Sequence, residues 1–336
     1  MSLPDIKYCP STLQPGYKTY SPAAQLALFG SRTKKVSHIL PFGPPGKSPE
    51  LTRDFNEKRK TISISGVQEK YSLVLKRNRL ELTGSKGSHI LKPVPMERLE
   101  LVDDMPANEH VSMQMAQQVF KIKTAGNAMI FFEEGSPAYI TRRFDYKDNG
   151  TKYQLEDFAI LLGKTPEKEG DDYKYNASYL DIAKMIDRYA PAARIVKLDF
   201  FRMLVFNYLI GNGDAHLKNF ALIESAQGDY ILAPAYDLMC TVIHIDDPSL
   251  ALHNGLYDGD MEEAAYRKFG TYTKRSFIVF AEKAGIDQPF ANEIIDNLMK
   301  GVPGAIEMIG RSFLSDAGKQ RYIDLLGDRL RRLRLE

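Results

Sequence analysis

The chain has 336 residues, 43% of them hydrophobic, which is enough to bury a large core in two domains or lobes. Its formal net charge of +2 gives no reason to treat the whole chain as a nucleic-acid binder. The two cysteines, Cys9 and Cys240, are far apart in the sequence and offer neither a disulfide framework nor a metal-ligand set, which agrees with a reducing compartment. The apolar runs end before the roughly 18 residues of a membrane helix, and the N-terminus lacks a signal-peptide pattern. We therefore expect a cytoplasmic protein that does not enter the membrane.

Residues 1–55 are predicted to form an N-terminal arm. This segment is rich in Pro, Gly, Ser and Tyr, and Pro41–Gly46 would interrupt any regular element. We expect loops with one short helix near Ala23–Phe29. The composition favours an arm that covers the core and does not form part of it.

Residues 56–145 are predicted to form a strand-rich N-lobe. Short runs that are apolar throughout or alternate with polar residues are typical of strands. The predicted strands are Ile62–Ser65, Tyr71–Leu75, Arg79–Leu82, His89–Leu91, Ala128–Phe132 and Ala138–Thr141. One helix, Glu109–Phe120, is predicted between them because its apolar residues recur at helical spacing.

Residues 146–336 are predicted to form a helical C-lobe. The helical patterns are Leu155–Leu162, Tyr179–Tyr189, Leu198–Ile210, Ser276–Ala284, Phe290–Met299 and Ala317–Leu333. A strand-rich lobe followed by a helix-rich lobe places the chain in the α+β class. The order of the two lobes is that of a two-lobed protein-kinase-like fold.

The most informative segment is Asn212–Asn219, which follows the apolar helix predicted at Leu198–Ile210. In protein kinases, a loop Asp accepts the proton of the substrate hydroxyl, and an Asn five positions later binds Mg²⁺. Asp214 and Asn219 have this spacing. Each residue alone would more often belong to an ordinary turn. Several polar groups directly after a buried helix, however, need partners in the protein or in a ligand, so together they indicate phosphoryl transfer.

A predicted hairpin follows this loop. Phe220–Ile223 and Tyr230–Leu232 are short apolar runs joined by a turn-rich connection, so they should pair as antiparallel strands. A hairpin returns the chain to its starting end, which would bring Asn219 close to Asp237. Amide and carboxylate oxygens suit Mg²⁺.

A second group of residues precedes this loop in the sequence. Gly66, flanked by small hydroxyl residues, could let backbone amides approach phosphates, although a lone glycine between strands more often marks a bulge or turn. Lys92 ends a predicted strand and could neutralise nucleotide phosphates. Glu109 opens the next predicted helix, where it could pair with Lys92 or stabilise the helix N-terminus.

Taken in order, these motifs resemble the HipA family of serine/threonine kinase toxins over roughly residues 60–245. The motifs are Ser63–Lys70, His89–Lys92, Asn108–Glu109, Arg143–Asp145, Gln154–Asp157, Lys174–Tyr175, Asp214–Asn219 and Tyr236–Asp237.

The resemblance implies an ATP- and Mg²⁺-dependent kinase in which Asp214 is the catalytic base and Asn219 and Asp237 bind Mg²⁺. The residues implied to contact ATP are Ser65, Gly66, Val67, Gln68, Glu69, Lys70, Lys92, Arg142, Arg143, Phe144, His216, Lys218, Asn219, Tyr236 and Asp237. Arg142 replaces the glutamate expected from HipA itself. If adenine binds through the main chain, this change matters little; if the glutamate side chain binds base or ribose, nucleotide preference would change.

The resemblance also implies autophosphorylation at Ser63 or Ser65, in the loop that would receive ATP. A phosphate there would add nearly two negative charges and inhibit the kinase.

The position of this loop, about sixty residues from the start, favours the short HipT type. The partners implied are a small HipS-like antitoxin and a helix-turn-helix HipB-like antitoxin, with DNA contacted only through the antitoxin. The implied target is an aminoacyl-tRNA synthetase, with the tryptophanyl enzyme favoured. Two other functions remain open: a catalytically silent nucleotide-binding scaffold of an antitoxin–DNA complex, and a small-molecule phosphotransferase.

Overall fold

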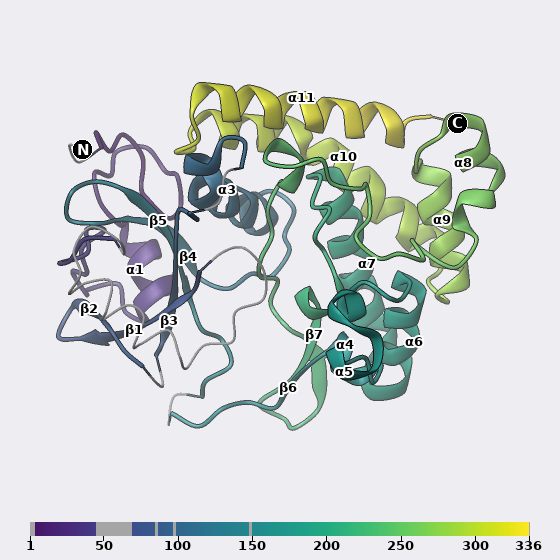
Figure 1. Ribbon diagram of the computed structural model, residues 1–336, viewed down its shortest axis with the longest axis horizontal. Helices are drawn as coiled ribbons and strands as arrows, with labels where there is room; N and C mark the ends of the chain where they lie inside the picture. Colours follow the sequence, from purple (N-terminus) through teal and green to yellow (C-terminus); the bar gives the residue numbers. More distant parts are fainter. Residues whose placement is uncertain (1–3, 45–68, 85–86, 97–98, 148–149, 336) are drawn as a thin grey trace. The chain divides into compact units, whose positions relative to one another are not determined.

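The computed structural model describes residues 4–44, 69–84, 87–96, 99–147 and 150–335, and it divides the chain into two compact units (Figure 1). Unit 1 comprises Met1–Gln114, Ala125–Tyr146 and Glu307–Lys319, and unit 2 comprises Met115–Thr124, Lys147–Ile306 and Gln320–Glu336. Among the described residues, no helix is both long and apolar enough to cross a membrane.

Unit 1 contains a five-stranded antiparallel sheet in the order β2-β1-β3-β5-β4. Its strands are β1 (Tyr71–Lys76), β2 (Arg79–Leu82), β3 (His89–Pro93), β4 (Asn127–Phe131) and β5 (Pro137–Arg142). Each lies within two residues of a predicted strand. The strand predicted at Ile62–Ser65 lies outside the described residues.

The two faces of this sheet carry different residues because strand side chains alternate. One face, with Leu91, Ala128 and Ile140, packs against helix α1 (Pro22–Phe29) in a hydrophobic core (Figure 1). The opposite face meets helix α3 (Met105–Gln118), whose Gln114 amide donates a 2.9 Å hydrogen bond to Asn127 Oδ1. Residues on β3 that alternate with Leu91 therefore face α3.

The N-terminal segment forms part of this core, so the expectation that it only covers the core is wrong for residues 4–44. Cys9, Tyr20 and Leu28 are buried in the same cluster as the strands. The predicted helix is present as α1. It begins where Ser21 Oγ accepts the Ala24 N–H, and it ends at a glycine with positive φ.

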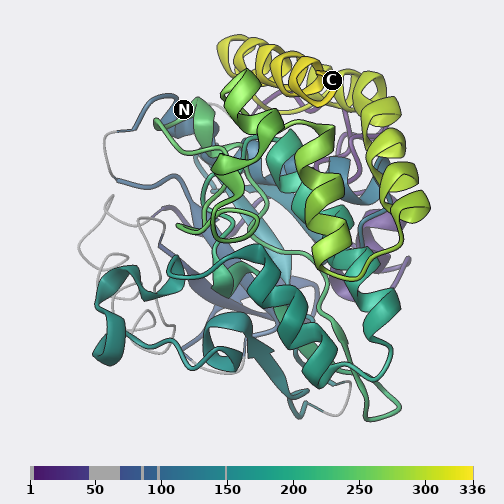
Figure 2. The ribbon, with the colours of Figure 1, turned by 90° about the vertical axis from the view of Figure 1, so that its right-hand side faces the viewer.

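Unit 2 is mainly helical, with a small antiparallel sheet in the order β6-β7-β8. The strands are β6 (Leu155–Asp157), β7 (Ala221–Glu224) and β8 (Tyr230–Leu232). Figures 1 and 2 both show this sheet at the opposite end of the unit from the C-terminal helices. The helix predicted over Leu155–Leu162 is wrong in its first part, because residues 155–157 pair with β7 and only α4 (Phe158–Leu161) is helical.

Each longer helix of unit 2 overlaps a predicted one, but α7 begins five residues before the predicted start at Leu198, and α10 continues eleven residues past the predicted end at Met299. They are α6 (Tyr179–Tyr189), α7 (Ala193–Leu209), α9 (Lys274–Lys283), α10 (Gln288–Gly310) and α11 (Asp316–Leu333), with parts of α10 and α11 in unit 1. Shorter helices that were not predicted are α5 (Pro166–Glu169) and α8 (Ala264–Phe269). Helix α7 is buried along most of its length, as its apolar composition predicts. It forms the support of the loop that follows.

Two buried histidines attach the N-terminal segment of unit 1. His89 Nε2 lies 2.9 Å from the Leu28 carbonyl oxygen, and His110 Nε2 lies 2.7 Å from the Ser11 carbonyl oxygen. Burial lowers the pKa of both histidines from 6.5 to about 4. Both side chains are therefore neutral donors at neutral pH.

We expect acid to destabilise this attachment. The unfolded chain protonates these histidines near pH 6.5, and the folded chain only near pH 4. The free energy of unfolding therefore has its full contribution from the neutral histidines above pH 6.5 and loses it as the pH falls from 6.5 to 4. The loss should reach about 3 kcal/mol per histidine. Urea unfolding from pH 7 to pH 4 should therefore show a smaller loss for His110→Gln, which keeps a donor but does not titrate. If the unfolding free energy of variant and parent fell equally between pH 7 and pH 4, this prediction would be contradicted.

Candidate active site

The loop that contains Asp214 starts from the buried end of α7 and is held by a short chain of hydrogen bonds. Asn207, on α7, accepts a 2.7 Å hydrogen bond from Asn212 Nδ2. Asn212 Oδ1 in turn accepts the Asp214 N–H at 3.3 Å. Both asparagines are buried. The backbone position of Asp214 is therefore set by side chains that belong to the core of unit 2.

The segment after β8 is attached to the same loop. The Tyr236 hydroxyl donates to the Lys218 carbonyl oxygen at 2.8 Å. Thr241 Oγ1 accepts the Gly213 N–H at 2.9 Å and donates to the Gly211 carbonyl oxygen at 3.3 Å. Residues 211–219 and 236–241 thus form one hydrogen-bonded assembly.

The hairpin expected between these two segments is present. Strands β7 and β8 are antiparallel, with Leu222 opposite Leu232 and Glu224 opposite Tyr230. Asn219 directly precedes the first strand region, and Asp237 follows the second. The hairpin returns the chain to the loop, as predicted.

Asp214 has two carboxylate oxygens in different surroundings. Oδ1 accepts a 2.6 Å hydrogen bond from the hydroxyl of Tyr175 and lies 3.9 Å from His216 Nε2. Oδ2 has no hydrogen-bond partner among the residues that the structure describes. The side chain is 50% exposed. An incoming hydroxyl group could therefore reach Oδ2.

His216 is buried beside two carboxylates and is neutral. Burial lowers its pKa to about 4, although the negative charges of Asp214 and Asp237 oppose this shift. These interactions place His216 within electrostatic range of both aspartates. A neutral imidazole does not balance their negative charge.

Two features of Asn219 and Asp237 fit a metal site. Asn219 Oδ1 is buried and has no hydrogen-bond partner among the residues that the structure describes, so it is an oxygen that needs a donor or a cation. Asp237 has a φ of 54°, a left-handed conformation that few non-glycine residues adopt and that is enriched at functional sites. The described residues contain no group of three His, Cys, Asp or Glu side chains that could hold a metal ion. An amide oxygen, a carboxylate and nucleotide phosphates together form a ligand set that suits Mg²⁺.

Lys92 and Glu109 form a buried ion pair within unit 1. The distance between Lys92 Nζ and Glu109 Oε1 is 2.5 Å, and the side chains are 4% and 1% exposed. Helix α3 begins at Met105, four residues before the predicted start, so Glu109 does not open the helix as expected. Its carboxylate points to the sheet face that carries Lys92.

Lys218, expected to line the ATP site, pairs with a carboxylate of the protein. Its Nζ lies 3.1 Å from Asp157 Oδ2, and Asp157 stands at the end of β6. The same carboxylate group caps α4 by accepting the Ile160 N–H at 3.0 Å. The charge of Lys218 is thus partly balanced within unit 2.

In the expected adenine-binding linker, residues 142–144, several polar groups already form hydrogen bonds within the protein. The Arg142 N–H donates to the Gly126 carbonyl oxygen at 2.7 Å, and the Arg143 N–H donates to the Ser88 carbonyl oxygen at 2.9 Å. The Arg143 guanidinium makes two hydrogen bonds to Asp145, at 2.9 and 2.5 Å. The backbone N–H groups of Arg142 and Arg143 are therefore already paired and could not also donate to adenine.

The remaining expected residues fall at the edge of the described chain or outside it. Glu69 accepts a hydrogen bond from the Tyr71 hydroxyl, and Lys70 directly precedes β1. Outside the described residues lie Ser63, Ser65, Gly66, Val67 and Gln68.

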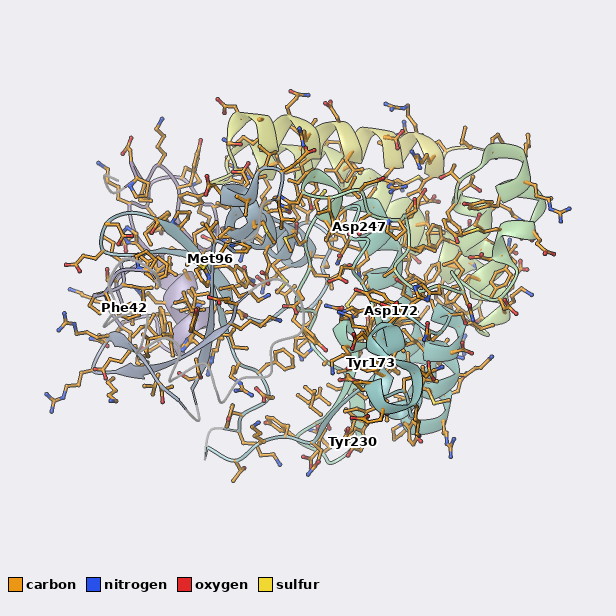
Figure 3. The ribbon with its side chains drawn as sticks, viewed as in Figure 1. Phe42, Met96, Asp172, Tyr173, Tyr230 and Asp247 are labelled. Atoms are coloured by element: carbon orange, nitrogen blue, oxygen red, sulfur yellow. The ribbon has the colours of Figure 1, made fainter. Side chains whose placement is uncertain are left out.

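Sequence reasoning assigned no role to three residues that surround Asp214. Tyr175 appeared only as part of a motif, and Thr241 and Asp247 did not appear at all. Asp247, labelled in Figure 3, has a buried Oδ2 without a hydrogen-bond partner in the described part of the chain. Burial raises its pKa, and the charge of Asp214 adds to this shift. No local pattern marks these contacts, because they join segments that are far apart in the sequence.

The family model described as the HipA-like C-terminal domain matches residues 62–306. A Haemophilus influenzae protein that is provisionally named a kinase is 27% identical over 283 residues, covering 80% of this chain and 79% of that protein. Two Sinorhizobium fredii proteins with names of the same kind are 28% and 32% identical over 82% and 57% of this chain. The chain spans only 64% and 48% of their lengths.

Two solved structures are similar in fold. HipA of Shewanella oneidensis, determined with HipB and operator DNA, superimposes with a TM-score of 0.61 at 19% identity, covering 81% of this chain and 65% of that chain. The proinflammatory kinase CtkA of Helicobacter pylori superimposes with a TM-score of 0.52 at 17% identity, covering 78% and 90%. The fold is therefore kinase-like and mixed α and β, which confirms the predicted fold class. Because the family model matches more than half of the sequence, the chain belongs to the HipA-like family.

Gly213 offers a direct test of the loop geometry. A Cβ atom at this position would lie 2.6 Å from Asp247 Cβ and 2.7 Å from the Pro248 carbonyl oxygen. We expect Gly213→Ala to displace the Asp214 loop, to cost about 1 to 3 kcal/mol of stability and to reduce any phosphate transfer about 100-fold. Thermal unfolding and a transfer assay would measure both effects.

The matched control is Gly310→Ala, because nothing lies within 4 Å of a Cβ atom there. A Gly213→Ala protein with unchanged stability and activity would show that the 213–248 contact does not constrain the loop.

Proposed function

We propose that the chain is an ATP- and Mg²⁺-dependent protein serine/threonine kinase that acts as the toxin of a bacterial type II toxin–antitoxin system. The observation that carries this proposal is the Asp214 loop with its unpartnered Asn219 oxygen, held against the segment that contains Asp237. Membership of the HipA-like family and the kinase names of several relatives support it.

The chemistry expected of these residues is positioning and charge stabilisation. Asp214 would accept the proton of the acceptor hydroxyl at its open carboxylate oxygen. Asn219 and Asp237 would hold Mg²⁺, which, when bound, neutralises the charge of the nucleotide phosphates. Lys92, aligned by Glu109, would be the lysine that contacts the nucleotide phosphates.

We further propose that the partners are antitoxins. HipA of Shewanella oneidensis was solved with HipB and its operator DNA, which supports a HipB-like helix-turn-helix partner and DNA contact through that partner. The short HipT type would add a small HipS-like antitoxin. An aminoacyl-tRNA synthetase, the tryptophanyl enzyme first, would be the substrate.

The deciding experiment is phosphate transfer by the purified chain. We expect incubation with ATP and Mg²⁺ to add phosphate at Ser63 or Ser65, as measured by intact mass and peptide mapping. Asp214→Asn should bind ATP but should add at least about 100-fold less phosphate, because the base is lost. The tryptophanyl-tRNA synthetase is included as a second acceptor.

Other outcomes would favour the alternatives. ATP binding without transfer to any protein would favour the silent nucleotide-binding scaffold. ATP turnover that depends on small alcohols, with no phosphoprotein formed, would favour a small-molecule phosphotransferase.

Variants of the buried Lys92–Glu109 pair distinguish a role in stability from a role in phosphate transfer. Glu109→Gln leaves the Lys92 charge buried without its anionic partner, so we expect a loss of about 3 to 5 kcal/mol in stability. A double variant, Lys92→Met with Glu109→Leu, replaces the pair with apolar groups and should recover most of this loss. Phosphate transfer should stay low in both. In Glu109→Gln, Lys92 has lost the carboxylate that aligns it, and in the double variant the lysine itself is absent.

Urea unfolding and the transfer assay would be run on both proteins. Activity that returns together with stability in the double variant would show that Lys92 serves the fold alone.

A further inference from the structure

Tyr175 makes the only hydrogen bond to the carboxylate of Asp214 that the described part of the chain supplies. Its hydroxyl donates to Oδ1 at 2.6 Å. Because Asp214 is half exposed, little else restrains the rotation of its side chain. The Asp214 N–H bond to Asn212 fixes the backbone of the residue but not the direction of the carboxylate.

The ring of Tyr175 is itself held firmly by other residues. It stacks on His253 with a centroid distance of 5.8 Å and an interplanar angle of 25°, and it meets His216 edge to face at 5.3 Å. The Tyr175 carbonyl oxygen accepts the His253 N–H at 2.9 Å, and His253 Nδ1 lies 2.9 Å from Asn176 Oδ1. The phenol is therefore placed independently of Asp214, and the hydrogen bond aligns the carboxylate to it.

The hydroxyl of Tyr175 remains protonated. Burial raises the pKa of Tyr175, and the hydrogen bond to Asp214 and the nearby charges of Asp247 and Asp172 raise it further. Figure 3 labels Asp172, in the turn just before Tyr175, and Asp247. A phenol in this setting keeps its proton and donates a hydrogen bond to Oδ1.

We propose that Tyr175 is a positioning residue for the phosphate transfer, which fixes Asp214 through Oδ1 and leaves Oδ2 directed to the acceptor. This inference rests on the proposed kinase function. The acceptor oxygen forms a bond to the γ-phosphorus, and the bond from that phosphorus to the bridging oxygen breaks, which releases ADP. The acceptor's proton passes to Asp214 Oδ2.

The test is Tyr175→Phe, which keeps the ring contacts and removes only the hydroxyl. We expect the rate at saturating ATP to fall about tenfold or more, with the ATP concentration for half-maximal rate changed less than about twofold. The acceptor is the chain's own Ser63 and Ser65 loop or the tryptophanyl-tRNA synthetase, whichever the parent phosphorylates. Tyr189→Phe, at the exposed end of α6, is the matched control and should act as the parent does.

A double variant distinguishes positioning from a general structural effect. If Tyr175 acts through Asp214, Tyr175→Phe should cause no further loss in an Asp214→Asn background, since the two residues act as a unit. Losses that multiply, a changed ATP requirement, or an unchanged rate in the single variant would each overturn the inference. Phosphate mapped on Tyr175 itself would also overturn it, because the hydroxyl would then be an acceptor.

The failure of this inference differs from the failure of the proposed function. An active parent with an equally active Tyr175→Phe variant rejects the positioning role alone. A folded parent that transfers no phosphate to either acceptor rejects the kinase function, and the positioning role with it. Thermal unfolding of each variant confirms that it is folded.

Discussion

The candidate site of unit 2 depends on the attachment of one loop to a buried helix and to a returning segment. Helix α7 ends in buried residues, and Asn207 carries that rigidity through Asn212 to the backbone of Asp214. Thr241 then joins the loop to the segment after the hairpin. Each bond alone contributes only about 1 kcal/mol. Together these bonds hold α7, the Asp214 loop and the segment at Thr241 in one arrangement. A reaction that is catalysed mainly by positioning depends on such a fixed arrangement.

In unit 1, a buried ion pair fixes the position of one strand relative to one helix. The alternation of side chains along β3 sends Leu91 to the core that contains α1 and sends Lys92 to the face covered by α3. A lysine buried there would be very costly without Glu109. The pair therefore ties the register of β3 to the position of α3, and a shift of one residue in the strand would place the charge in the hydrophobic core.

How far the sequence predicts this structure depends on the range of the contacts. The loop spacing from Asp214 to Asn219 and the following hairpin are local patterns, and both could be predicted. The strand at Leu155–Asp157 could not, because Leu-Glu-Asp has no strand pattern of its own and directly precedes the apolar residues of α4, while its partner β7 lies far along the chain. The same limit explains the N-terminal segment, whose core residues Cys9 and Tyr20 are separated by turn-forming residues.

The contact between Tyr175 and Asp214 also joins distant segments, and the left-handed backbone of Asp237 has no signature in the sequence. Both were therefore beyond prediction, although the residue types were visible. A motif can name the groups that carry chemistry, but the orientation of a carboxylate depends on tertiary contacts.

The electrostatics of the loop follow from these contacts. The negative charges of Asp214 and Asp237 both act on the pKa of His216, and the charge of Asp214 raises the pKa of Asp247. The three carboxylates therefore interact electrostatically in this part of unit 2. His216 is too deeply buried to be protonated at neutral pH, so it adds no positive charge to balance them. A cation at the proposed site would reduce the repulsion among these carboxylates. It would also give a partner to Asn219 Oδ1, which has none among the described residues. The folded loop therefore carries an unfavourable interaction that a divalent cation would relieve, and this is the physical reason to expect the cation and the anionic nucleotide to bind together.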